Sequence, residues 1–132
     1  MNPAIVVSLQ VLVVDESPYV GDVLVSAFER EGCRASIARD RAQALQLLRS
    51  LQPDLITVEV GREVDSSFVS QLVADAKLQG TAFIVIVPSK RGVPPDVANR
   101  AVRVFEKPFY LSEVVATTLA TLNSPRTVRR AS

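Results

Sequence analysis

The side chains best suited to chemistry in this sequence are three carboxylates and one lysine, each close to the end of an apolar run. Asp15 and Glu16 directly follow one run, Glu59 lies near the end of another, and Lys107 follows a third. Carboxylate oxygens are the ligands that Mg²⁺ prefers, and an ammonium group neutralises a phosphoryl group. If the runs are parallel strands of one sheet, their carboxyl ends meet at one edge. We therefore expect the four side chains to share one acidic crevice.

Two counts restrict the chemistry further. The sequence contains no histidine, which excludes a Ser-His-Asp triad, an imidazole base and a histidine-ligated metal. Its one cysteine, Cys33, cannot form an intrachain disulfide or a cysteine-rich zinc site. Any reaction must therefore use carboxylates, lysine, arginine or hydroxyl groups.

The composition indicates one globular domain. The chain has 132 residues, of which 48% are hydrophobic and 22% charged, as is usual for a single domain with a sizeable core. The net charge of +1 does not favour nucleic acid or an anionic membrane as a partner. The longest apolar stretch, residues 4–14, contains Ser8 and Gln10 and is shorter than the roughly 20 residues of a membrane span. We expect a soluble cytoplasmic protein.

Short apolar runs alternate with stretches of helical periodicity along the chain. The runs predict five strands, at residues 11–14, 33–38, 55–60, 83–87 and 102–105. Asp40 is a suitable N-cap for the second helix, and Pro94 indicates a late start for a short fourth helix. This order predicts a doubly wound α/β domain with a parallel sheet, right-handed crossovers and helices on both faces. Residues 1–122 would form the domain and residues 123–132 a flexible C-terminal tail.

Three segments resemble conserved motifs of the response-regulator receiver family, whose members are described as CheY-like. Residues 11–18 (VLVVDESP) resemble its first strand and acidic pair, and residues 53–59 (PDLITVE) resemble its third strand. Residues 105–109 (FEKPF) resemble its lysine-proline-phenylalanine motif, in which the Lys-Pro peptide is usually cis. The resemblance extends from about residue 10 to residue 122. It implies a flavodoxin-like (βα)5 fold with strand order 2-1-3-4-5 and a role in two-component (phosphorelay) signal transduction.

The sequence departs from this family at three positions of the phosphorylation switch. Glu59 stands where the resemblance places the phospho-accepting aspartate, and its extra methylene extends the carboxylate by about 1.5 Å. A misplacement of about 1 Å can slow an alignment-dependent reaction on the order of 100-fold. Val87 stands at the switch threonine or serine and cannot donate its hydrogen bond, and Val104 replaces a switching aromatic residue. We interpret the chain as a pseudo-receiver in which Glu59 reaches Lys107 directly.

The leading interpretation is an atypical receiver domain that acts as a phosphorylation-independent protein-protein interaction module and not as an enzyme. Its partner would be a histidine kinase, an output protein or another signalling component. The resemblance places the contact surface on the fourth helix, fifth strand and fifth helix, with Tyr110 the residue expected to be most exposed. The residues concerned are Val97, Ala101, Val104, Tyr110 and Val114. A homodimer through the same surface is left open.

No cofactor is required on this interpretation. Asp15, Glu16 and Glu59 would form at most a weak or vestigial Mg²⁺ site. The three arginines at positions 126, 129 and 130 are expected to be solvated in the tail, and neither a nucleic-acid nor a membrane partner is predicted.

Two alternatives remain. A working phosphorelay receiver would use Glu59 as an atypical acceptor in Mg²⁺-dependent phosphoryl transfer; Lys107 and the acidic pair favour it, and Val87 and Val104 oppose it. A flavin or nucleotide site would fit the topology, but the sequence has no Gly-x-Gly-x-x-Gly loop. Phosphoryl uptake separates the first alternative from the pseudo-receiver.

Overall fold

Five strands and five helices alternate along the chain. The computed structural model describes residues 9–15, 20–60, 66–78, 80–91 and 93–122. The elements are β1 (Gln10–Val14), α1 (Val20–Arg30), β2 (Arg34–Ala38), α2 (Arg41–Leu51), β3 (Leu55–Glu59), α3 (Ser66–Leu78), β4 (Ala82–Val87), α4 (Pro95–Arg100), β5 (Arg103–Glu106) and α5 (Leu111–Leu122). No helix in the described part of the chain is long and apolar enough to cross a membrane.

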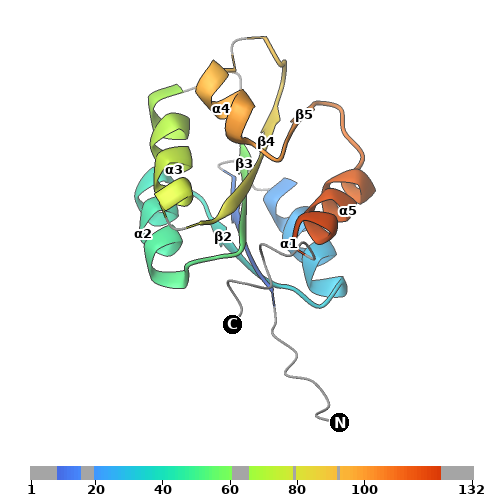
Figure 1. Cartoon of the computed structure of the whole chain (residues 1–132). Helices are drawn as coiled ribbons and strands as arrows, with labels where there is room; N and C mark the ends of the chain where they lie inside the picture. The colour runs from blue at the N-terminus through green and yellow to red at the C-terminus, as the bar shows by residue number, and fades with distance from the viewer. Residues whose placement is uncertain (1–8, 16–19, 61–65, 79, 92, 123–132) are drawn as a thin grey trace.

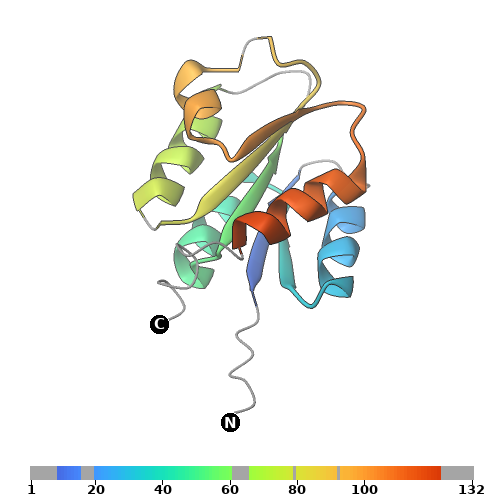
Figure 2. The ribbon, with the colours of Figure 1, turned by 45° about the vertical axis from the view of Figure 1, so that its right-hand side comes forward.

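The strands form one parallel sheet in the order β2-β1-β3-β4-β5. Helices α1 and α5 cover one face, and α2, α3 and α4 lie on the other (Figures 1 and 2). This is the doubly wound flavodoxin-like arrangement that the sequence predicted. Asp15, Glu59 and Lys107 therefore follow or end strands at one edge of the sheet.

The core consists of two apolar layers, one on each side of the sheet. Leu12 and Val14 of β1 pack in the layer beneath α2, α3 and α4, whereas Val11 and Val13 pack in the layer beneath α1 and α5. Because successive side chains of a strand point to opposite faces, a strand covered on both faces must be apolar throughout. The continuous apolar runs of the sequence have this physical cause.

Local signals fix several helix ends as predicted. The Asp40 carboxylate accepts a hydrogen bond of 2.8 Å from the backbone N–H of Gln43 and caps α2. Helix α2 ends at Leu51, and its C-cap Gln52 adopts a left-handed conformation with φ of 46°. Pro94 occupies the N-cap position of α4, a short helix of six residues, so the prediction of a late start is confirmed. The predicted tail, residues 123–132, lies outside the described residues.

Candidate functional site

The candidate site lies at the carboxyl edge of the sheet, where β1, β3 and β5 end. Asp15 follows β1, Glu59 is the last residue of β3, and Lys107 follows β5. Strands β1 and β3 are neighbours, whereas β4 separates β3 from β5. The backbone N–H of Lys107 donates to the carbonyl of Val87 over 2.9 Å, which holds the lysine at the end of β4. From there its side chain reaches across to β3.

Glu59 and Lys107 form an ion pair. The Lys107 Nζ donates a hydrogen bond to Glu59 Oε1, as the sequence predicted. The Glu59 side chain is only 5% exposed, and that of Lys107 is 35% exposed. Glu59 Oε2 is buried and has no hydrogen-bond partner among the described residues. The buried carboxylate therefore depends on Lys107 for its charge compensation.

Asp15 is oriented towards helix α1. Its side chain is buried, and its backbone N–H donates to the carbonyl of Ala38 over 3.0 Å. A Cβ on Gly21 would lie 3.1 Å from Asp15 Oδ2 and 2.5 Å from Ile37 Cδ1, so glycine makes room for both side chains. Gly21 lies in the first turn of α1, where exposed N–H groups and the helix dipole favour a negative charge. Sequence reasoning missed this role of Gly21.

The described carboxylates do not fit a Mg²⁺ ion. Such an ion usually keeps several of its waters, whereas Glu59 is almost fully buried and engaged by Lys107. Asp15 packs against Gly21. Within the described ranges, no group of three acidic, histidine or cysteine side chains is placed to hold a metal. Glu16, the remaining predicted ligand, lies outside the described residues.

The switch position is apolar and fully packed. Val87 is buried in the layer beneath α2, α3 and α4. The nearest hydroxyl along the chain, Ser89, is exposed and accepts a hydrogen bond of 3.2 Å from the Arg91 backbone N–H. The Lys90 backbone N–H donates to Glu106 Oε2 over 2.7 Å, which ties this loop to the end of β5. Ser89 is thus engaged within its own loop and does not replace the missing switch hydroxyl.

The side chains of β5 alternate between the two layers. Val104 is half-buried against the layer beneath α2, α3 and α4, and Phe105 is buried in the layer beneath α1 and α5. Phe105 therefore points away from the face of Val104. The centroid of the Phe105 ring lies 6.5 Å from that of Phe109. The Arg103 guanidinium lies over the Phe105 ring, 4.4 Å from its centroid. Phe105 is thus fixed in the core and does not replace the missing switching aromatic residue.

The predicted contact surface is only partly accessible. Val97 and Val114 are both buried, so placing them on a contact surface was wrong. Val97 is the buried residue of α4, and Val114 begins the inward-facing stripe of α5. Ala101 and Val104 are half-buried, and Tyr110 is 74% exposed, as expected.

Sequence reasoning missed Val102, which is 41% exposed. It was assigned to the fifth strand, but β5 begins one residue later, at Arg103. Arg103 is exposed and lies 3.7 Å from Glu113. A charged residue inside an otherwise apolar run was the signal that this strand lies at the edge of the sheet.

Comparison with known proteins shows the fold. No family model and no curated protein matches the chain, whereas many solved structures do. A response regulator from Thermotoga maritima matches with a TM-score of 0.71 and 22% identity, over 89% of this chain and 100% of that one. A CheY-like receiver domain protein from Methanospirillum hungatei JF-1 matches with a TM-score of 0.76 and 18% identity, over 89% and 95%. The signal receiver domain of an HD domain-containing protein from Pseudomonas fluorescens Pf-5 matches with a TM-score of 0.74 and 20% identity, over 88% and 95%.

These likenesses define the class of structure to which the chain is similar. It has the α/β fold of response-regulator receiver domains along nearly the whole length of the solved examples. The Lys107-Pro108 peptide is cis, as the resemblance implied. At such identities the match establishes the fold, and function must be argued from the residues of the site.

Proposed function

We propose that this chain is an atypical receiver domain of two-component-type signal transduction that binds a protein partner without being phosphorylated. The observation that carries the proposal is the ion pair between Glu59 and Lys107. It occupies the two positions at which the receiver resemblance places the phospho-acceptor and its neutralising lysine.

The ion pair obstructs both partners of a phosphoryl transfer. An acceptor oxygen must approach the phosphorus atom to about 3–3.5 Å with the correct alignment. Glu59 is 5% exposed and one of its oxygens is bound to Lys107. The ammonium that would stabilise an incoming phosphoryl group already compensates the Glu59 carboxylate. The transfer would have to break a largely buried ion pair before it began.

The chain also lacks the two side chains that would convert phosphorylation into a conformational change. A ligand shifts a conformational equilibrium only by its differential affinity for the two states. A hydrogen bond from a switch hydroxyl to a phosphoryl group would contribute roughly 1.5–3 kcal/mol to that difference. Val87 is buried and has no hydroxyl, and Val104 is packed against the core. We therefore expect the partner surface to be the same with and without a phosphoryl donor.

The partner surface that we propose extends along β5 to the start of α5. The exposed apolar side chains of this surface are Val102, which directly precedes β5, and Tyr110, which directly precedes α5, and the exposed Arg103 is the first residue of β5. Tyrosine and arginine often dominate the energetics of protein interfaces. The partner would be a histidine kinase, an output protein or another signalling component. No cofactor is needed for this function, and we propose neither a membrane nor a nucleic-acid partner.

Intact-mass measurement after incubation with acetyl phosphate and Mg²⁺ tests the proposal. We expect no mass gain in the wild-type protein and no change in the ¹⁵N–¹H resonances of Val102 and Tyr110. The Glu59→Asp variant is the matched comparison, because its shorter carboxylate releases Lys107, and we expect it to gain more phosphoryl than the wild type. A stoichiometric gain in the wild type that disappears in Glu59→Gln would instead identify a working receiver with a glutamate acceptor.

A further inference from the structure

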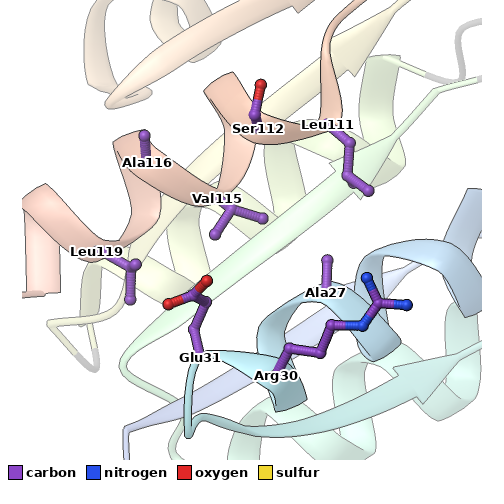
Figure 3. A pocket seen from close by; sticks show the side chains of 8 residues that line it. All are labelled: Ala27, Arg30, Glu31, Leu111, Ser112, Val115, Ala116 and Leu119. Atoms are coloured by element: carbon purple, nitrogen blue, oxygen red, sulfur yellow. The ribbon is translucent and has the colours of Figure 1, made fainter.

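An apolar groove with a volume of about 360 Å³ lies between α1 and α5 (Figure 3). The side chains that α5 contributes to it are aliphatic or small, and they belong to Leu111, Ser112, Val115, Ala116 and Leu119. Val115 and Leu119 also pack against the core layer beneath α1 and α5, so the groove continues that layer outwards. Exposed apolar surface of this kind is typical of a site that another segment or molecule covers.

The apolar run at the start of the sequence is longer than the strand to which it leads. The run begins at Ala4, whereas β1 begins only at Gln10. Residues 4–7 (AIVV) are four consecutive apolar residues without a charge, and the strand does not account for them. Apolar runs of this length are unfavourable in water and are expected to be buried. A second apolar contact, outside the sheet, would bury them.

The described part of the chain begins close to the groove. Leu9, the first described residue, packs against the same core layer as Val115 and Leu119. Its carbonyl accepts a hydrogen bond of 2.8 Å from the backbone N–H of Arg34, three residues after Glu31, which lines the groove. Three residues extend over at most about 11 Å, and the five residues before Leu9 can span about 17 Å. This segment is therefore long enough to enter the groove at the Glu31 end.

We propose that residues 4–8 fold back into the groove and that the side chains of residues 5–7 cover its apolar wall. Residues 4–8 carry no charge, whereas residues 123–132 carry three arginines, which the apolar wall cannot compensate. Covalent linkage to Leu9 gives residues 4–8 an effective concentration in the millimolar range, which a separate partner or a second copy lacks. The inference does not depend on the proposed function, since the groove shares no residue with the partner surface.

Nuclear Overhauser contacts in the isotope-labelled full chain test the proposal on the wild-type sequence. We expect contacts between the methyl groups of residues 5–7 and those of Val115 or Leu119. Their relative intensity should not change when the protein is diluted, because the contact is intramolecular. Contacts from Val128 to the same methyl groups would assign the groove to the C-terminal segment and overturn the proposal. The absence of any contact from residues 5–7 to the groove would overturn it as well.

A disulfide cross-link locates the contact independently. In a Cys33→Ala background, Val6→Cys/Ala116→Cys should oxidise to a cross-linked monomer, because Ala116 is exposed on the wall of the groove. Val6→Cys/Ser50→Cys is the matched control, since Ser50 is exposed near the end of α2, on the opposite face of the sheet (Figure 1). We expect about tenfold less cross-linked monomer in this control. Equal cross-linking of the two pairs, or a cross-linked dimer as the main product, would overturn the proposal.

Discussion

Replacing Lys107 by methionine should destabilise the protein much more than replacing Glu59 by methionine. Without Lys107, a carboxylate that is 5% exposed loses its one ion-pair partner among the described residues, and its second oxygen is already unsatisfied. Removing one member of a fully buried pair costs about 3–5 kcal/mol. Because the Lys107 side chain is 35% exposed, water screens part of the interaction, and we expect a loss of about 2–3 kcal/mol.

Replacing Glu59 instead leaves the Lys107 ammonium group without its partner. In Glu59→Met the buried charge is replaced by an apolar side chain of similar length, and Lys107 extends its ammonium group into solvent. The free energy of unfolding should stay within about 0.5 kcal/mol of the wild-type value. The double variant should resemble Glu59→Met, because no buried charge remains. The double-mutant cycle should therefore give a coupling energy of about 2 kcal/mol.

Equilibrium unfolding in urea measures these differences. With a denaturant slope of about 1–3 kcal/mol per molar urea for a small domain, Lys107→Met should lower the midpoint by roughly 1 M. The slope itself should not change, since the compactness of the native state is unaltered. If Lys107→Met lay within about 0.5 kcal/mol of the wild type, or if both single variants lost equal stability, Glu59 would not depend on Lys107 and the reasoning would be wrong.

Three other substitutions test separate parts of the structure. Val87→Thr buries a hydroxyl among apolar side chains and should cost about 1–3 kcal/mol in thermal unfolding, and a fully stable variant would mean that the hydroxyl finds a partner. Asp40→Ala removes the acceptor for the Gln43 N–H and should cost about 1 kcal/mol, whereas Asp40→Asn should be nearly neutral in the same assay. Burial raises the pKa of the Cys33 thiol above its ordinary value of 9.0, so the unfolded chain loses this proton more easily than the folded one. The free energy of unfolding should therefore fall as the pH rises above 9.0, by at most about 1.4 kcal/mol per pH unit. Urea midpoints measured over this pH range should show the decrease in the wild type, and Cys33→Ala should lack the part of it that comes from the thiol.

The fold was largely predictable because its strands are covered on both faces. Burial on two sides requires the continuous apolar runs that mark β1, β3 and β4, and Pro94 is compatible only with a late start of α4. The sheet order came from the family resemblance, since periodicity does not specify which strands pair. Val102 was misplaced because β5 is a short edge strand, and its alternating pattern of burial is weak there.

The candidate site was predictable where a side chain extends directly from a strand end. Glu59 is the last residue of β3 and Lys107 follows β5 at the same edge of the sheet, so their charges and lengths were enough to predict the contact. The orientation of Asp15 depends on the space at Gly21. The hydrogen bond from Lys90 to Glu106 depends on the path of a loop. Neither is encoded in a local pattern, and the sequence could not indicate them.

On the proposed function, the length of the Glu59 side chain explains why glutamate at position 59 occurs together with valine at position 87. The Glu59 carboxylate gives Lys107 a counter-charge from within the domain, at the place where the resemblance would put a phosphoryl group. Two charges about 4 Å apart attract by at most about 4 kcal/mol at an effective dielectric of 20, which biases a two-state equilibrium by several hundred-fold. A hydrogen bond from a switch hydroxyl would contribute roughly 1.5–3 kcal/mol, comparable with the coupling energy of about 2 kcal/mol expected for the screened pair, so most of it would be used in offsetting the ion pair. With Glu59 in place, a threonine at position 87 would therefore give little conformational response to phosphorylation, and a valine that fills the core is the more stabilising residue.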